Sequence, residues 1–419
     1  MLLSLIIIVL IGVIAYFHYL QGFFSAAISA VLAAIAAILA IGYHEVVVNL
    51  AGNTYLPEYA TAASIVAIFA VSYLVLRLLF DAAVPGYVHF ALMVDRAGAI
   101  AMGLVAGVIA AGVFAIAAQA LPFGPNVAGN CRYPVEFEKK TVIKLATSVA
   151  VLDAVYDQLD AEKYVRNESG DASGLWVPAD SIVLKLVTLV SREGGSLDCG
   201  RSFETIHPDF LQELFGQRVG LQPGSRHSAA ASSLGVGGVF MLTGPILQDD
   251  PERWTREGAP VGIRGAKGSA PALTREYKPG SGKVALVVRV KPETAGADPG
   301  PSGLIAFTPA SARLAANRKN YFPIGTLESG RVLYRNVVDD PLFLPAGKSV
   351  DLVYEVPEAD VVQPGKDKNA APKVAPDVLV EFKRSARADL GFKQVTKGVT
   401  PPGDAVEVVR KEGSPSVDM

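Results

Sequence analysis

The sequence predicts a membrane α-helical domain of four transmembrane helices, followed by a soluble α+β part in which a short helical region precedes a β-sandwich. Two observations predict this fold class. Residues 1–122 are almost continuously apolar and contain just two Lys or Arg residues, Arg77 and Arg96. The rest of the 419-residue chain has ordinary charge, many Pro and Gly residues and no sustained apolar run. That second composition is typical of a domain that folds in water.

Net charge and composition also limit the function and divide the chain. The formal net charge is −2, and a nucleic-acid partner would call for a strongly basic face, so we expect none. We expect four parts: a transmembrane domain at 1–122, a mainly helical extracytoplasmic region at 123–235, a β-sandwich domain at 236–396 and a disordered tail at 397–419.

Four apolar segments are each close to the roughly 20 residues that cross about 30 Å of hydrocarbon. The first segment lacks the basic start and the small-residue cleavage motif of a signal peptide, so it is expected to be retained. The second is rich in Ala, whose small side chain lets helices approach closely. The segments are Leu2–Tyr19, Phe23–Tyr43, Thr61–Leu79 and Ala97–Leu121.

The basic residues near the span ends predict the orientation. Arg77 and Arg96 flank the loop at 80–96, whereas the loop at 44–59 contains acidic residues and no Lys or Arg. Since short cytoplasmic loops are enriched in Lys and Arg, the 80–96 loop is placed inside. Both termini and the region after residue 122 are then extracytoplasmic. Arg132, Lys139 and Lys140 oppose this assignment, although long translocated domains follow the charge rule poorly.

The fourth span carries the main candidate residues. Gly103 and Gly107 form a GxxxG motif with Gly98 and Gly112 nearby, which allows close packing on another helix of the same bundle or of a second subunit. Asp95 and Arg96 stand where this helix enters the interface. They are interpreted as a solvated or snorkelling collar, with functional intramembrane charges as the alternative. On the third span, Arg77 and Asp81 are spaced i,i+4, which allows them to pair.

The chain has two cysteines, Cys131 and Cys199, both after the apolar region. A single disulfide in an oxidising compartment is one interpretation, and closing that loop would stabilise the fold by about 4 kcal/mol in the chain-entropy model. Two unrelated buried thiols are the other. A zinc site is not expected, because there is no CxxC motif or His cluster.

The membrane region resembles the colicin V production protein family. The resemblance rests on four closely spaced spans and on the run Val94-Asp95-Arg96-Ala97-Gly98-Ala99, which continues through Ala101 to Gly107. It covers about residues 1–122. The resemblance implies a bacterial inner-membrane protein, linked to colicin V production or export and to envelope maintenance. The short Gln21-Gly22 loop and the Ala-rich second span depart from the more polar and glycine-marked pattern of the family.

The soluble part is expected to begin with helices and continue as strands. Apolar residues at helical spacing predict helices at Lys140–Lys163, from Pro178 to Gly194, and at Phe210–Phe215, whose apolar faces would pack on one another. Valine-rich runs bounded by Gly, Pro or Asp predict an antiparallel sandwich. The predicted strands are Val236–Thr243, Lys283–Lys291, Gly330–Tyr334, Val350–Val356 and Asp377–Lys383.

The segment from Leu344 to Pro357 is similar to a turn and strand found in immunoglobulin-like domains of bacterial envelope proteins, with Ala346 interrupting the turn. This similarity concerns the fold alone. The segments 245–279 and 357–376 are expected to be polar connections. The tail after Lys397 lacks apolar periodicity and is expected to be disordered.

No catalytic, cofactor or metal site is predicted. Some relatives of this membrane domain carry an extracytoplasmic trypsin-like protease, but the chain contains no G-D-S-G-G or G-x-S-x-G motif for a serine nucleophile and oxyanion hole. His207 and His227 are interpreted as surface or capping residues, and Asp249-Asp250 as solvated carboxylates.

Three functional hypotheses remain from the sequence. The favoured one is a non-enzymatic multi-pass protein of the bacterial inner membrane, which contacts the lipid bilayer, presents an extracytoplasmic interaction domain, and binds itself or another envelope protein. The second is a subunit of an oligomeric transporter or channel, for which Ser25, Ser29, Ser64, Ser72 and Gln119 are the polar candidates within the spans. The third is a membrane-tethered hydrolase with an unrecognised site.

Overall fold

The computed structural model divides the chain into two compact units, a helical unit and a β-rich unit. Among the described residues, the helical unit ends at Val219 and the β-rich unit begins at Ser233. The described residues are 2–52, 59–84, 90–122, 127–130, 132, 174–192, 201–219, 233–244, 246–249, 274–293, 304–307, 311–328, 332–335, 342–363, 371–383, 386–402 and 409–410.

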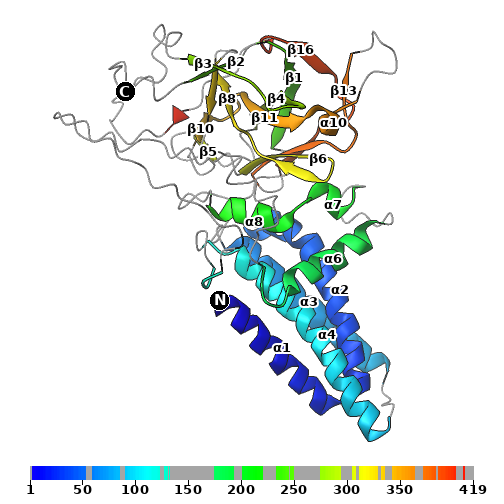
Figure 1. Ribbon diagram of the computed structural model, residues 1–419. Coiled ribbons are helices and arrows are strands. Elements are labelled where there is room, and N and C mark those ends of the chain that lie inside the picture. The colour runs from blue at the N-terminus through cyan, green and yellow to red at the C-terminus, as the bar shows by residue number, and fades with distance from the viewer. Residues whose placement is uncertain are drawn as a thin grey trace, which may run out of the picture. The chain divides into compact units, whose positions relative to one another are not determined.

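Four long helices form the first part of the helical unit (Figure 1). Each has the length and apolarity needed to cross a membrane, which confirms the predicted spans. A short π-helical turn, Val48–Gly52, continues the second helix. The helices are α1 (Leu2–Gln21), α2 (Phe23–Val47), α3 (Ala60–Ala83) and α4 (Leu92–Gln119).

Helix α4 is central in this bundle, because it packs extensively on both α1 and α2, while α3 packs mainly on α2. The small side chains of Ala33, Ala36, Ala37 and Ala40 are buried, so α2 approaches its neighbours closely. The outward faces of α1 and α3 expose large apolar side chains, as expected for surfaces that meet lipid.

In the described part of the helical unit, three shorter helices follow the bundle: α6 (Ala179–Arg192), α7 (Phe203–Ile206) and α8 (Phe210–Val219). The predicted helix at Lys140–Lys163 lies outside the described residues. The apolar face of α6 was expected to pack on the other soluble helices, but its main contacts are with α4 and α2. Val183 and Val187 join a buried cluster that includes Ile41 and Ile116 of the long helices. That cluster offers α6 a larger apolar surface than the short helices α7 and α8 could provide.

The β-rich unit consists mainly of short strands in several sheets (Figure 1). The longest sheet has the order β16-β1-β4-β11-β8-β9-β2-β3, and the next has the order β15-β14-β6-β7. The strands are β1 (Leu234–Leu242), β2 (Ile246–Asp249), β3 (Thr274–Tyr277), β4 (Lys283–Pro292), β5 (Leu304–Phe307), β6 (Ala312–Ala316), β7 (Lys319–Tyr321), β8 (Gly325–Glu328), β9 (Val332–Arg335), β10 (Leu342–Pro345), β11 (Val350–Pro357), β12 (Val362–Gln363), β13 (Lys373–Val374), β14 (Leu379–Phe382), β15 (Ala386–Asp389), β16 (Val395–Gly398) and β17 (Val409–Arg410). A one-turn helix, α10 (Glu358–Val361), follows β11.

Apolar side chains point to both faces of β4, which explains why this strand lies in the interior of the long sheet. Leu286 and Val288 point into a core shared with β6, β10 and β14, whereas Ala285 and Val287 point into a second cluster on the opposite face. A strand buried on both faces reads as a continuous apolar run, as this one does. The five predicted strands correspond to β1, β4, β9, β11 and β14.

The pairing differs from the expected purely antiparallel arrangement. β1 pairs with β16 in parallel, and β2 pairs with β9 in parallel, so the long sheet is mixed. Parallel pairing joins strands distant in sequence, and local turn patterns do not predict it. The immunoglobulin-like interpretation stays a prediction.

Three segments expected to be polar connections or disordered contain strands. β2 and β3 pair within the stretch at 245–279, and β12 and β13 pair within the stretch at 357–376, where α10 also lies. β17 pairs with β10 through Val409 and Phe343, in the tail expected to be disordered. Strands this short carry little periodicity of their own. They are held by backbone hydrogen bonds to a neighbouring strand, which the local sequence does not reveal.

Candidate functional site

The turn between α1 and α2 is held by the two charged residues at the start of α4. A carboxylate oxygen of Asp95 accepts a hydrogen bond from the backbone N–H of Phe23 at 2.9 Å. The guanidinium carbon of Arg96 lies 4.6 Å from the centroid of the Tyr19 ring, as in a cation–π contact. Both contacts are made to residues that flank Gly22, so Asp95 and Arg96 clamp this turn.

Gly22 explains why the clamp is needed. It has a φ of 93° and supplies no side chain to cap α2. The first N–H groups of a helix lack partners within the helix, and Asp95 supplies one from outside. A Cβ on residue 22 would lie 3.1 Å from a carboxylate oxygen of Asp95. The positive φ and the close approach together require glycine at this position.

A second polar cluster lies at the same end of the bundle. Arg77 of α3 donates to the hydroxyl oxygens of Ser29, at 3.2 Å, and Ser25, at 3.1 Å, on α2. Its Nε forms an i,i+4 ion pair with Asp81 at 3.0 Å. Ser25 in turn donates to the side-chain oxygen of Gln21 at 3.2 Å. A guanidinium at the edge of an apolar bundle is thereby supplied with acceptors, and α3 is fastened to α2.

The glycines of α4 face three different helices, α1, α2 and α6. A Cβ on Gly103 would lie 3.1 Å from the Cα atom of Ala15, and one on Gly107 would lie 3.2 Å from the Cα atom of Ile11. The GxxxG pair therefore contacts the backbone of α1. A Cβ on Gly98 would lie 2.5 Å from a ring carbon of Phe23.

Gly112 faces α6. A Cβ at this position would lie 2.3 Å from the carbonyl oxygen of Ala179 and 2.6 Å from a methyl carbon of Val183. The backbone of α6 therefore rests directly on α4 at Gly112. Neither the GxxxG spacing nor the glycine count indicated that a helix from beyond the bundle would occupy this position.

A buried carboxylate fixes the start of α6. Asp180, which is fully buried, accepts hydrogen bonds from the side-chain amide of Gln119 at 2.9 Å and from Arg132 at 2.7 Å. It also accepts the backbone N–H of Ser181 at 2.7 Å. A buried charge is tolerated when it is paired and hydrogen-bonded in this way. The sequence places Asp180 in the start signal of a helix, but no local pattern indicates this network.

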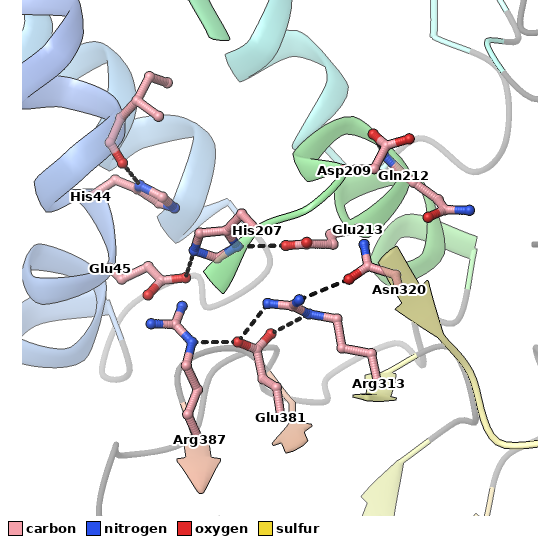
Figure 2. A network of polar contacts seen from close by, with 11 residues as sticks. His44, Glu45, His207, Asp209, Gln212, Glu213, Arg313, Asn320, Glu381 and Arg387 are labelled. Carbon is pink, nitrogen blue, oxygen red and sulfur yellow. Dashed lines mark hydrogen bonds and ion pairs between the residues drawn. The ribbon is translucent and has the colours of Figure 1, made fainter. Parts of the chain in front are cut away.

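A histidine lies between two carboxylates where α2 meets α7 and α8. The Nδ1 atom of His207 is 2.6 Å from a carboxylate oxygen of Glu213, and its Nε2 atom is 3.6 Å from one of Glu45, as Figure 2 shows. Phe203 and Phe210 pack around the imidazole ring with centroid separations of 4.9 and 5.3 Å. The interpretation of His207 as a surface residue is wrong, because its side chain is buried, but the residue does occupy the C-cap position of α7.

The chemistry of this arrangement differs from that of a catalytic triad. In a triad, one ring nitrogen contacts a carboxylate and the other contacts the nucleophile. Here both nitrogens of His207 face carboxylates. A doubly protonated imidazole would serve both, because only that form donates from both nitrogens. The arrangement can therefore join α2 to α8 by ion pairing.

The β-rich unit has charged networks of its own. Glu381 of β14 lies in register with Arg313 on one side and Arg387 on the other, and it pairs with both at 3.0 and 2.6 Å. Figure 2 includes this group, together with Asn320, whose side-chain oxygen accepts from Arg313 at 3.0 Å. Arg289 of β4 and Asp351 of β11 likewise pair across the long sheet. These networks link neighbouring strands.

The remaining candidate residues do not add a functional site. Cys131 and Cys199, and with them the disulfide hypothesis, lie outside the described residues, as does His227. Among the residues that the structure describes, no group of three or more His, Cys, Asp or Glu side chains is arranged to hold a metal ion.

Comparison with known proteins gives one match. Residues 3–143 match the sequence model of a family described as colicin V production protein. The searches of curated proteins and of solved structures give no match. The matched segment contains α1 to α4, the Asp95-Arg96 clamp and the four glycines of α4. The membrane helices of this chain therefore match the colicin V production protein family, as the sequence predicted.

Proposed function

We propose that this chain is a non-enzymatic, multi-pass protein of the bacterial inner membrane, in which the helical bundle anchors an extracytoplasmic interaction domain. The observation that carries the proposal is the match of residues 3–143 to the colicin V production protein family, over four helices able to span a membrane. The family description supports a link to colicin V production, and we extend this link to export and envelope maintenance as the sequence resemblance implies.

The positions of the basic residues support the proposed orientation. Arg77 contacts the start of α2, and Arg96 contacts the end of α1, so both lie at the end of the bundle where α1 turns into α2. By the positive-inside rule this end faces the cytoplasm. Arg132, which argued for the opposite orientation, belongs to the other end and forms an ion pair with Asp180. On this orientation the β-rich unit is extracytoplasmic.

The polar side chains support an anchor rather than a transport pathway or a hydrolase. Ser25 and Ser29 are acceptors for Arg77, and Ser64 donates to the backbone carbonyl of Thr61. Gln119 donates to Asp180. These polar side chains already form hydrogen bonds within the chain. They would have to break these bonds in order to line a pore. His207 contacts two carboxylates, which does not fit the role of a catalytic base.

A partner is expected to use other surfaces than the glycine face. Gly103 and Gly107 already contact α1, and Gly112 contacts α6. Self-association or binding of another envelope protein would therefore use the outward faces of the bundle or the β-rich unit. Of the two alternatives for the glycines, these contacts favour packing on helices of the same chain.

A dual topology reporter tests the proposal. Fusions after Asn130 and at the C-terminus should both report an extracytoplasmic position, and a fusion inserted between α3 and α4 should report the cytoplasm. A cytoplasmic signal from the first two would overturn the proposed orientation and localisation of the interaction domain.

The interaction role needs its own experiment. Crosslinking in intact membranes followed by purification of the full chain should recover a second copy or another envelope protein. Recovery of a partner-free monomer alone would contradict the interaction role. Flux through proteoliposomes containing the purified chain, or activity of the chain on ester, peptide or glycan substrates, would favour the transporter or hydrolase hypothesis.

A further inference from the structure

Helix α6 has one broad apolar face, and protein covers only part of it. Val183 and Val187 are buried against the long helices. Beside them, Ile182, Leu189 and Val190 are exposed to 42%, 66% and 45%. An amphipathic helix buries its apolar face against protein or lipid, so the exposed part of this face calls for a lipid contact.

The charged and polar residues of α6 fit the same environment. Asp180 is buried in its network with Gln119 and Arg132. Lys185 stands on the exposed face, and a lysine can extend its aliphatic stem along an apolar surface while its ammonium reaches the lipid headgroups. The side of the helix turned away from the bundle carries Ser181, Lys185 and Thr188, so the exposed apolar side chains lie beside a polar strip.

The place of α6 on the bundle indicates its depth. Gly112, where α6 rests on α4, lies about 24 Å from Arg96 along the axis of α4, at about 1.5 Å per residue. Arg96 marks one edge of the apolar region, and the hydrocarbon layer is about 30 Å thick. The contact at Gly112 is therefore inside the hydrocarbon layer, near its opposite edge. Figure 1 shows α6 running alongside the long helices.

The segment that leads into α6 continues a surface that faces lipid. Leu175 is buried with Leu3 and Ile7 of α1, and the neighbouring Trp176 is 59% exposed. Tryptophan is enriched where the hydrocarbon meets the headgroups. At 14 residues, α6 is about 21 Å long and too short to span the membrane.

We propose that α6 is a membrane-embedded helix that enters the extracytoplasmic edge of the bilayer without crossing it, with Ile182, Leu189 and Val190 in contact with lipid acyl chains. The membrane domain then extends beyond its four spanning helices. The β-rich unit follows a fifth lipid-contacting element, which restrains how the chain leaves the bilayer. Because the contact at Gly112 sets the depth, the inference is independent of which partner the protein binds.

Tryptophan fluorescence tests this inference on the full chain in phosphatidylcholine vesicles. Trp176 and Trp254 are the only tryptophans, and both are first replaced by Phe. Leu189→Trp then places one reporter on the exposed part of the apolar face of α6. Quenching by lipids brominated along the acyl chain measures contact with hydrocarbon, and quenching by iodide measures contact with water.

Two matched positions calibrate the result. Val9→Trp reports an exposed position on α1, and Val399→Trp reports an exposed position in the β-rich unit. We expect Leu189→Trp to be quenched by brominated lipid to an extent comparable with Val9→Trp and protected from iodide. Bromines near the headgroups should quench it more than bromines at the chain ends, since the helix lies near the edge of the bilayer.

The other outcomes would overturn the inference. Iodide quenching equal to that of Val399→Trp would place α6 in water. Protection from both quenchers would mean that protein covers this face, either another segment of the chain or a second copy. Ile182→Trp, one turn from the start of α6, repeats the measurement independently should Leu189→Trp fail to fold.

Discussion

The carboxylate of Asp95 on α4 accepts the backbone N–H of Phe23, the first residue of α2, at 2.9 Å. The cap of α2 thus comes from a helix that lies far away in the sequence. Because Asp95 is also adjacent to Arg96, which contacts Tyr19 of α1, a single turn of α4 fixes both helices of the α1–α2 hairpin. Charges at a membrane interface here serve the fold.

Removing this cap is expected to destabilise the bundle. Asp95→Ala leaves the Phe23 N–H without its acceptor, and losing a helix cap costs about 1–2 kcal/mol. Asp95→Asn retains a side-chain oxygen at the same position and should recover most of the stability. Unfolding of the purified chain in detergent, followed by circular dichroism, measures the difference. Equal stability of the Ala variant and the natural chain would show that the hydrogen bond contributes nothing.

Leucine at Gly103 or Gly107 should displace α1. Added side-chain atoms would meet the α1 backbone at Ala15 and Ile11, which cannot move without shifting the helix. Gly12→Leu is the matched control, since nothing lies within 4 Å of a Cβ placed at that glycine. We expect the first two variants to weaken a crosslink engineered between α1 and α4, and the control to keep it. If all three behave alike, the contact between α1 and α4 is not set by these glycines.

Asp180→Ala should detach the start of α6. Arg132 would lose its ion-pair partner and Gln119 one of its acceptors, and breaking a buried pair on one side costs about 3–5 kcal/mol. Protease cleavage near α6, monitored on the reconstituted full chain, should become faster. Ser181→Ala is the milder control, because it removes one partner of Arg132 and leaves the ion pair. Unchanged cleavage in Asp180→Ala would show that packing at Gly112 alone holds the helix.

The pair of Arg289 and Asp351 allows a double-mutant test. Their bidentate contact, at 2.7 Å for each bond, joins β4 to β11, and Asp351 is fully buried. Arg289→Met alone would leave a buried carboxylate unpaired and should cost about 3–5 kcal/mol, whereas Arg289→Met with Asp351→Leu should restore most of the stability. Chemical denaturation of the full chain, monitored by the β-sheet signal, separates these cases. An additive loss in the double variant would contradict the expected coupling.

Tyr354 makes the β-rich unit sensitive to high pH. Burial raises the pKa of its hydroxyl well above the usual range, and the hydroxyl finds no hydrogen-bond partner among the described residues. In the unfolded chain the hydroxyl ionises near pH 10, while the folded chain keeps it protonated. Stability from this group is therefore complete below about pH 10 and is lost as the pH rises further.

Tyr354→Phe should remove that part of the pH dependence and gain about 1 kcal/mol at neutral pH, because no unpaired polar atom then remains buried at this position. Tyr321→Phe is the contrasting variant. The Tyr321 hydroxyl donates a hydrogen bond to Asp360 at 2.6 Å, so its removal should lower the stability of the folded chain. Thermal unfolding at pH 7 and above pH 10 measures both. A loss of stability at neutral pH in Tyr354→Phe would mean that the hydroxyl is favourably placed.

Much of the secondary structure follows from local sequence. The four spans are determined by apolar runs of sufficient length, and strands such as β4 and β11 by their valine-rich composition. The start of α6 follows from Pro178 and the residues after it. These features depend on neighbours within one helical turn or one strand, so reading along the chain is enough to find them.

Short strands escaped prediction for a physical reason. β5, β8 and β16 have four residues each, and each takes its stability from pairing with a strand elsewhere in the chain. The parallel pairing of β1 with β16 joins positions near Val239 and Val395, which no local pattern connects. Strand propensity mainly reflects how well a side chain packs against neighbouring strands. The neighbours of a short segment therefore determine whether it forms a strand.

The sequence alone determined that this protein has four membrane spans, a glycine-lined fourth helix and a β-rich region, because chain length, hydrophobicity and periodicity are local properties. The tertiary structure alone decided what these features contact. Gly107 meets α1, Gly112 meets α6, Asp95 caps α2, and His207 lies between two carboxylates. Such contacts join residues that are far apart in the chain. They form only when the whole fold packs closely, so no local stretch of sequence specifies them.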